Sequence, residues 1–158
     1  MENQVPSFFS LLRRGDIYYH APGSLPEDIL KWLIQTIPVA GINKDALLKA
    51  VLEREDLMPT AMGNGIALPH PRNPMLELEE AQFAALAFLE NGIDWGALDG
   101  KAVDTVILVV SASARIHLSM LQRITFFCRD EGFCTLLRRR APAEEIFGYI
   151  EQGEKSWK

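Results

Sequence analysis

The sequence predicts an α/β protein in which helices cover a mixed β-sheet. Three observations support this fold class. Segments with helical spacing lie toward both ends of the chain, short apolar segments without that spacing occupy its middle, and the turn-forming pairs Asn91-Gly92 and Asp99-Gly100 separate them. The 158 residues contain no internal repeat and no low-complexity linker, so we expect residues 1–158 to form one domain.

Two helices are expected in the N-terminal half. Ser24-Leu25-Pro26-Glu27 has the pattern of a capping box. Apolar residues then recur at helical spacing until Pro38, namely Leu25, Ile29, Leu30, Leu33, Ile34 and Ile37. The second helix begins after Asn43 as its N-cap. Its apolar side carries Ala46, Leu47, Ala50, Val51 and Leu57, and its side toward water carries Lys44, Lys49, Glu53 and Glu55.

Three strands and two further helices follow. The strands are expected at residues 65–68, 82–89 and 104–110, and the last two are apolar at nearly every position, as is typical of strands covered on both faces. A long helix is expected from Ser113, with its apolar face including Met120 and Ile124, and Gly132 is expected to break it. A final helix is expected near Pro142.

Composition and charge exclude several classes of protein. The longest apolar stretches are far shorter than the roughly 20 residues of a membrane-spanning helix, and the N-terminus lacks the pattern of a secretory signal, so we expect a cytoplasmic protein without membrane insertion. The formal net charge of −5 argues against nucleic-acid binding. The basic residues at 136–140 are expected at a solvated helix end, and Cys128 and Cys134 are expected to be buried, reduced thiols.

His70 has an unusual backbone setting between Pro69 and Pro71. Pro71 favours an extended conformation for the residue before it, and Pro69 has a fixed φ and no amide hydrogen, so the imidazole is held in one direction. Upstream, Gly63 and Gly65 permit a tight turn whose amides can line an anion site. The pattern matches neither a Walker loop nor a dinucleotide fingerprint, and a proline-rich turn that simply ends a strand is the alternative.

An imidazole at this position suits nucleophilic attack on phosphorus. Its reference pKa of about 6.5 leaves most of it unprotonated at neutral pH, with a free lone pair. The phosphoryl oxygens then need positive or hydrogen-bonding neighbours, which Arg54, Arg72 and a second imidazole can supply.

Of the other two histidines, His117 is the stronger candidate. It lies in the first turns of the long helix on the side that faces the protein, whereas His20 is expected at the end of a short strand. No Ser-His-Asp order with a nucleophile elbow and no zinc-type spacing is present. A metal site formed by His70, His117 and a carboxylate is a further alternative.

Three stretches together resemble the fructose/mannitol-type enzyme IIA domains of the bacterial phosphotransferase system, which include the nitrogen-regulatory IIA proteins. Residues 52–72, LEREDLMPTAMGNGIALPHPR, resemble the segment around the family's phosphorylated histidine. Residues 97–110, ALDGKAVDTVILVV, resemble its Asp-Gly turn and buried strand, and HLSMLQRIT from His117 resembles its His-Leu helix. The likeness runs from about residue 10 to residue 152. The chain departs from the pattern at Ala61, at Pro71 and in residues 110–118, which lack a proline.

The resemblance implies a three-layer α/β/α fold with the mixed sheet sandwiched between helices. It also implies a phosphotransferase with a phosphohistidine intermediate, in which Nε2 of His70 takes a phosphoryl group from the histidine-containing phosphocarrier protein. His117 corresponds to the second active-site histidine and Arg54 to the arginine near the phosphate, with Arg72 a weaker match. The implied phosphate-binding residues further include Gly63, Asn64 and Gly65, and no metal or organic cofactor is required.

Two roles are compatible with this resemblance. Because the 158 residues contain only a IIA-like unit, without a sugar-specific IIB or membrane IIC part, we favour the nitrogen-regulatory type, which acts on a regulatory protein target. The alternatives are a sugar-specific IIA component that passes phosphate to a IIB domain for sugar uptake, and a non-catalytic interaction module switched by phosphorylation.

Overall fold

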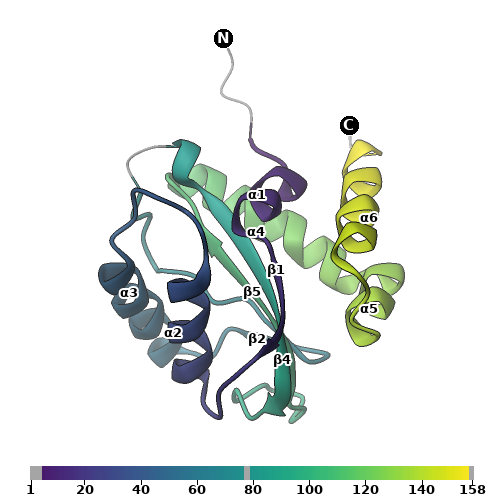
Figure 1. Cartoon of the computed structure of the whole chain (residues 1–158), viewed down its shortest axis with the longest axis horizontal. Coiled ribbons are helices and arrows are strands. Elements are labelled where there is room, and N and C mark those ends of the chain that lie inside the picture. Colours follow the sequence, from purple (N-terminus) through teal and green to yellow (C-terminus); the bar gives the residue numbers. More distant parts are fainter. Residues whose placement is uncertain (1–4, 77–78, 157–158) are drawn as a thin grey trace.

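The computed structural model describes residues 5–76 and 79–156 (Figure 1). Its elements, in chain order, are α1 (Phe8–Gly15), β1 (Ile17–Ala21), α2 (Pro26–Thr36), α3 (Lys44–Leu57), β2 (Ala61–Gly63), β3 (Ile66–Ala67), a 3₁₀ turn (Glu79–Ala81), β4 (Phe83–Ile93), β5 (Val103–Val110), α4 (Ala114–Arg129), α5 (Glu131–Arg138) and α6 (Ala143–Lys155). Within these residues, no helix is long and apolar enough to cross a membrane.

The five strands form one mixed sheet in the order β1-β4-β5-β3-β2. β1 pairs with β4 and β3 pairs with β5 in parallel, whereas β4 with β5 and β2 with β3 are antiparallel. The expected strands at 65–68, 82–89 and 104–110 are present as β3, β4 and β5. The expected mixed sheet is therefore confirmed.

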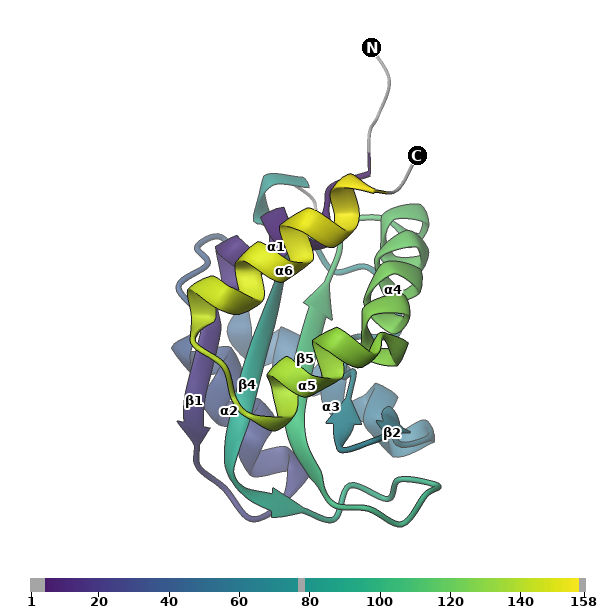
Figure 2. The same cartoon turned by 90° about the vertical axis from the view of Figure 1, so that its right-hand side faces the viewer.

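Helices cover both faces of the sheet, which confirms the three-layer α/β/α fold. α1, α4, α5 and α6 pack on one face, and α2 and α3 on the other (Figures 1 and 2). Alternate residues of β4 enter the two cores, with Leu86 and Phe88 on the side of α4 and Ala87 and Leu89 on the side of α2. All of these side chains are fully buried.

Three expected local signals are wrong in detail. α2 begins at Pro26, so Leu25 and not Ser24 is its N-cap, and Leu25 is 59% exposed. Asp28 is the acceptor at this helix start, because its carboxylate accepts the amides of Ser24 and Leu25. On α3, Leu57 is 63% exposed and not part of the apolar side, since it lies in the last turn beyond the contact with α2.

Gly132 does not break the long helix. α4 ends at Arg129, and Asp130 begins a new helix by accepting the Phe133 amide with its carboxylate at 3.0 Å. Gly132 lies inside α5, where a Cβ would come within 2.2 Å of the Tyr149 hydroxyl. The glycine therefore leaves room for the Tyr149 side chain of α6 and does not end a helix.

Asn91-Gly92 is not a turn between strands, because β4 continues to Ile93. Its pairing with β5 is irregular there: Phe88 pairs with Thr105 and Ile93 with Val103, so four residues of β4 face one of β5. A bulge accommodates the extra residues. The Asp99-Gly100 turn is present, with the Gly100 amide bonded to the Ala97 carbonyl and Gly100 at φ +75°.

The two cysteines are free thiols, but only Cys128 is buried. Burial raises the pKa of Cys128 to about 12. Cys134 is partly exposed, and its thiol donates to the Cys128 carbonyl. The basic segment lies at the end of α5 as expected, although Arg140 turns back to donate to the Leu89 carbonyl.

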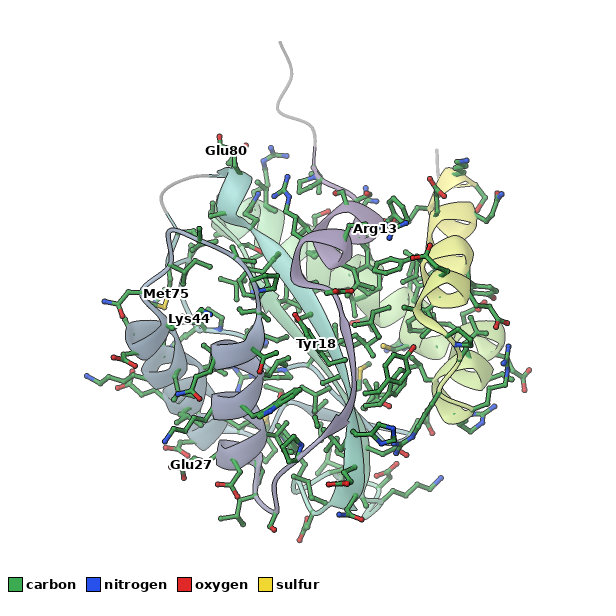
Figure 3. The ribbon with its side chains drawn as sticks, in the orientation of Figure 1. Arg13, Tyr18, Glu27, Lys44, Met75 and Glu80 are labelled. Atoms are coloured by element: carbon green, nitrogen blue, oxygen red, sulfur yellow. The ribbon has the colours of Figure 1, made fainter. Side chains whose placement is uncertain are left out.

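Contacts between α1 and α6 join the two ends of the chain. Arg13 on α1 pairs with Glu144 and lies over the ring of Phe147 at 4.3 Å (Arg13 is labelled in Figure 3). Deeper in this contact, the carboxylate of Glu154 accepts the amides of Phe8 and Phe9 at the start of α1, at 2.7 and 2.9 Å. An anion at a helix N-terminus satisfies amides that have no partner within the helix.

Replacing Glu154 should therefore destabilise the protein. Its side chain is only 7% exposed and also pairs with Arg123 at 3.0 Å, so Glu154→Ala is expected to lower the free energy of unfolding by about 3 kcal/mol. Chemical denaturation measures this loss. Glu144→Ala removes an exposed partner of Arg13 and is expected to cost less than about 1 kcal/mol. Equal losses for the two variants would contradict the role given to Glu154.

Candidate active site

The backbone around His70 is held on both sides. The segment leaves β3 beside β5, where the Pro69 carbonyl accepts the Val109 amide at 3.2 Å. On the other side, the Leu68 amide donates to the Thr60 carbonyl at 3.1 Å. Pro69 and Pro71 are both buried, so the prolines that frame the histidine belong to the packed structure.

One hydrogen bond determines which nitrogen of His70 carries the proton. Nδ1 lies 2.8 Å from the Leu68 carbonyl oxygen. A carbonyl only accepts, so Nδ1 is the donor, and in the neutral ring Nε2 then has the free lone pair. The geometry therefore makes Nε2 the nucleophilic nitrogen.

The second imidazole at the site comes from α4. The Ser113 hydroxyl caps this helix by accepting the Ile116 amide, and His117 follows in the first turn. The ring centroids of His70 and His117 lie 4.9 Å apart, with an angle of 50° between the ring planes. The structure thus brings together two histidines that are 47 residues apart in sequence.

Both imidazoles are shifted toward the neutral form. Burial lowers the pKa of His70; the bond to Leu68 opposes this shift, the charge of Arg54 adds to it, and the charge of Glu55 opposes it. Burial, followed by the neighbouring His70, lowers the pKa of His117 to about 4. At neutral pH the pair is therefore uncharged, and His70 can act as a nucleophile without a separate base.

Arg54 lies in the last turn of α3, half-buried, and its Nη1 donates to the Met58 carbonyl at 2.7 Å. The positive charge of Arg54 lowers the pKa of His70.

Arg72 is exposed and lines a hollow of about 530 Å³ beside α3. Within residues 5–76 and 79–156, no hydrogen bond joins either arginine to His70.

The loop at residues 63–65 has three consecutive positive φ angles, of +97°, +58° and +81°. Its Asn64 amide donates to the Asp99 carboxylate at 3.0 Å. The Gly65 carbonyl accepts amides at the start of β5, whereas Pro69, just before His70, bonds near the end of that strand. The loop backbone and His70 therefore lie beside opposite ends of β5, and the phosphate-binding role of Gly63, Asn64 and Gly65 stays a prediction.

Glu55 was expected to face water, and that expectation is wrong. Its Oε2 accepts the Thr60 amide at 2.7 Å and the indole N–H of Trp95 at 2.8 Å, and its Oε1 accepts the Thr60 hydroxyl at 2.7 Å. Helical spacing alone hides this role, because Trp95 is 40 residues away. The sequence signal that could have indicated a role for Glu55 is its position directly after Arg54, a candidate site residue.

One alternative from the sequence is a metal site formed by His70, His117 and a carboxylate. In the described part of the chain, no group of three or more His, Cys, Asp and Glu residues is placed to hold a metal ion. Two carboxylates adjoin Arg54 in sequence: Glu55 is engaged by Thr60 and Trp95, and Glu53 lies 4.0 Å from Lys49. The site therefore consists of paired imidazoles beside an arginine.

Comparisons with known proteins identify the family of this chain. The sequence model of the family "Phosphoenolpyruvate-dependent sugar phosphotransferase system, EIIA 2" matches residues 10–153. A nitrogen regulatory protein of Bradyrhizobium diazoefficiens is 34% identical over 114 residues, which cover 71% of this chain and 72% of the relative.

Two solved structures share the fold. The nitrogen regulatory protein IIA-Ntr from Neisseria meningitidis has a TM-score of 0.71 at 18% identity, covering 85% of this chain and 92% of that one. Enzyme IIAMTL, in its complex with phosphorylated enzyme IIBMTL from Escherichia coli, has a TM-score of 0.65 at 19% identity, covering 86% and 94%. The family match over most of the chain shows that the protein belongs to the EIIA type 2 family of the phosphoenolpyruvate-dependent sugar phosphotransferase system.

Proposed function

We propose that this protein is a histidine phosphocarrier in which Nε2 of His70 accepts a phosphoryl group from the histidine-containing phosphocarrier protein. The observation that carries the proposal is the hydrogen bond from Nδ1 of His70 to the Leu68 carbonyl, because it leaves the lone pair of Nε2 available. Membership of the EIIA type 2 family supports the choice of reaction.

The proposed step exchanges one phosphorus–nitrogen bond for another. Nε2 of His70 attacks phosphorus with its lone pair while the bond from phosphorus to the donor's histidine nitrogen breaks, and that nitrogen leaves with the bonding electrons. Nδ1 of His70 keeps its proton, so the phosphorylated ring is stabilised by the same bond to Leu68. The transfer needs positioning and charge stabilisation more than acid–base chemistry.

His117 and Arg54 have different parts in this mechanism. His117 is neutral at pH 7, because its pKa is about 4, and so it offers an N–H donor to the phosphoryl oxygens and not a fixed positive charge. Arg54 supplies the permanent cation beside His70. Arg72 is proposed as a further phosphate contact on the resemblance alone. The same role for residues 63–65 stays a prediction of the resemblance, because their backbone lies beside the end of β5 opposite to His70.

We favour a nitrogen-regulatory role, in which phosphorylation of His70 changes the charge of a docking face and thereby the binding of a regulatory protein target. The 34% identity to a nitrogen regulatory protein supports this role. The structural likeness to enzyme IIAMTL, found with phosphorylated enzyme IIBMTL, keeps a sugar-specific IIA component as the second candidate. The two roles differ in the acceptor, which is a regulatory protein in the first and a IIB domain in the second.

The first test is the site of phosphorylation. With phosphoenolpyruvate, enzyme I and the phosphocarrier protein, the wild type is expected to take up one acid-labile phosphoryl group, and His70→Ala none, because the nucleophile is gone. Mass spectrometry after digestion maps the modified residue. His20→Ala, which changes an exposed histidine on β1, is the matched control and should be phosphorylated normally. Uptake by His70→Ala would refute the proposal.

The second test concerns Arg54. Removal of one well-placed positive group from a transfer site typically slows the reaction by ~10²–10³-fold, so Arg54→Ala is expected to slow phosphorylation of His70 by that factor. Rapid-quench measurement of the phosphorylated fraction gives the rate. Arg138→Ala, at the exposed end of α5, is the control for a lost positive charge. An unchanged rate for Arg54→Ala would remove Arg54 from the mechanism.

The third test uses the pKa of His117. Its pKa is about 4 in the folded protein and about 6.5 in an unfolded chain, so the unfolded state binds a proton first as the pH falls. The stabilising contribution is therefore complete above pH 6.5 and is lost between about pH 6.5 and pH 4. Denaturation series over this range should show a shallower decline for His117→Phe than for the wild type. Identical declines would contradict the neutral, half-buried state of His117.

A further inference from the structure

A continuous path of hydrogen bonds runs from Trp95 to the imidazole of His70. The indole N–H of Trp95 donates to Oε2 of Glu55, and the same oxygen accepts the Thr60 amide. The Thr60 carbonyl accepts the Leu68 amide, and the Leu68 carbonyl accepts Nδ1 of His70. Each bond is between 2.7 and 3.1 Å long. A displacement of Glu55 would therefore shift Thr60, then Leu68, and then the imidazole of His70.

The far end of this path is firmly anchored. Trp95 is 3% exposed and belongs to the core beneath α2 and α3. The next residue, Gly96, has a φ of +81°, and a Cβ there would come within 3.1 Å of the Pro59 ring. The loop that carries Trp95 is therefore packed directly against the turn that contains Thr60.

The same carboxylate also determines where Arg54 points. Glu55 holds Thr60 by both its amide and its hydroxyl, and Thr60 ends the short turn that begins at Met58. The Met58 carbonyl in turn accepts Nη1 of Arg54 at 2.7 Å. Loss of the Glu55 bonds would release this turn, and with it the guanidinium.

We propose that Glu55 is a positioning residue for phosphoryl transfer: held by Trp95 and bonded to Thr60, it keeps Nδ1 of His70 protonated and holds the turn whose Met58 carbonyl binds Arg54. The proposal rests on the proposed function, since it assigns Glu55 a part in the reaction of His70. Glu55 itself touches neither phosphorus nor the reacting nitrogen.

Four variants separate geometry from charge. Glu55→Ala removes all three bonds. Glu55→Gln keeps an oxygen at the Oε2 position for both N–H donors, and its amide can donate to the Thr60 hydroxyl, so it removes the charge but retains the geometry. Trp95→Phe removes the indole N–H from the path. Trp32→Phe, in α2 beside the Tyr18 ring, is the matched control for loss of an indole.

Two measurements are made on each variant, the rate of phosphorylation of His70 by the phosphocarrier protein and the tautomer of His70 from its ¹⁵N chemical shifts. Glu55→Ala is expected to slow the transfer by about 10²-fold, because misplacement by about 1 Å has that effect. It should also show a mixture of tautomers. Glu55→Gln should recover most of the rate and the Nδ1–H tautomer, Trp95→Phe should be intermediate, and Trp32→Phe should match the wild type.

Wild-type rate and tautomer in Glu55→Ala would overturn the proposal. So would equal losses of rate in Glu55→Ala and Glu55→Gln with an unchanged tautomer, because the charge and not the geometry would then matter. If Glu55→Ala does not fold, Trp95→Phe decides in the same way: an unchanged rate and tautomer overturn the proposal. If the wild type itself takes up no phosphoryl group, the proposed function fails, while the tautomer measurement still tests the positioning by Glu55.

Discussion

The parallel pairing of β3 with β5 is the constraint on which the site depends. His70 follows β3 and His117 lies in the helix that follows β5, so two strands that run in the same direction deliver both imidazoles to the same edge of the sheet. β5 is buried on both faces over most of its length. A shift of register by one residue would exchange its two faces, so the core itself holds the histidines opposite each other.

The site also depends on the three layers. Arg54 comes from α3, which covers one face of the sheet, and His117 comes from α4, which covers the other. His70 lies between them at the end of a strand. The candidate site is thus assembled from α3 on one face of the sheet, α4 on the other and the end of β3 between them, and no single element carries the whole site.

Burial and not ion pairing sets the protonation of this site. Burial is the main cause of the lowered pKa of both histidines, and the opposite charges of Arg54 and Glu55 largely oppose each other at His70. A neutral imidazole whose proton is held at Nδ1 by a backbone carbonyl has its lone pair on the other nitrogen at physiological pH. In the proposed reaction, phosphorylation of that nitrogen adds negative charge within the electrostatic influence of Arg54.

Much of this protein follows from local sequence. The buried strands β4 and β5 are recognisable by their apolar composition, and the helices α3 and α4 by the caps Asn43 and Ser113. The two prolines beside His70 make it a candidate functional residue. The resemblance of residues 52–72 to a known family then added Arg54 to the candidate site, and the resemblance of HLSMLQRIT added His117. These features are recognisable because each depends on residues within a few positions of one another.

Tertiary structure decided the rest. The helix α1 has a local N-cap in Ser7, but its first two amides are bonded to Glu154, 146 residues away from Phe8 in the chain. Asn91-Gly92 lies in a bulge because β5 continues beside it. Glu55 has the spacing of a residue that faces water, yet it is bonded to Trp95. Such contacts leave no local pattern, because they form only after distant segments have been brought together and the loss of chain entropy has been offset by burial of the shared core.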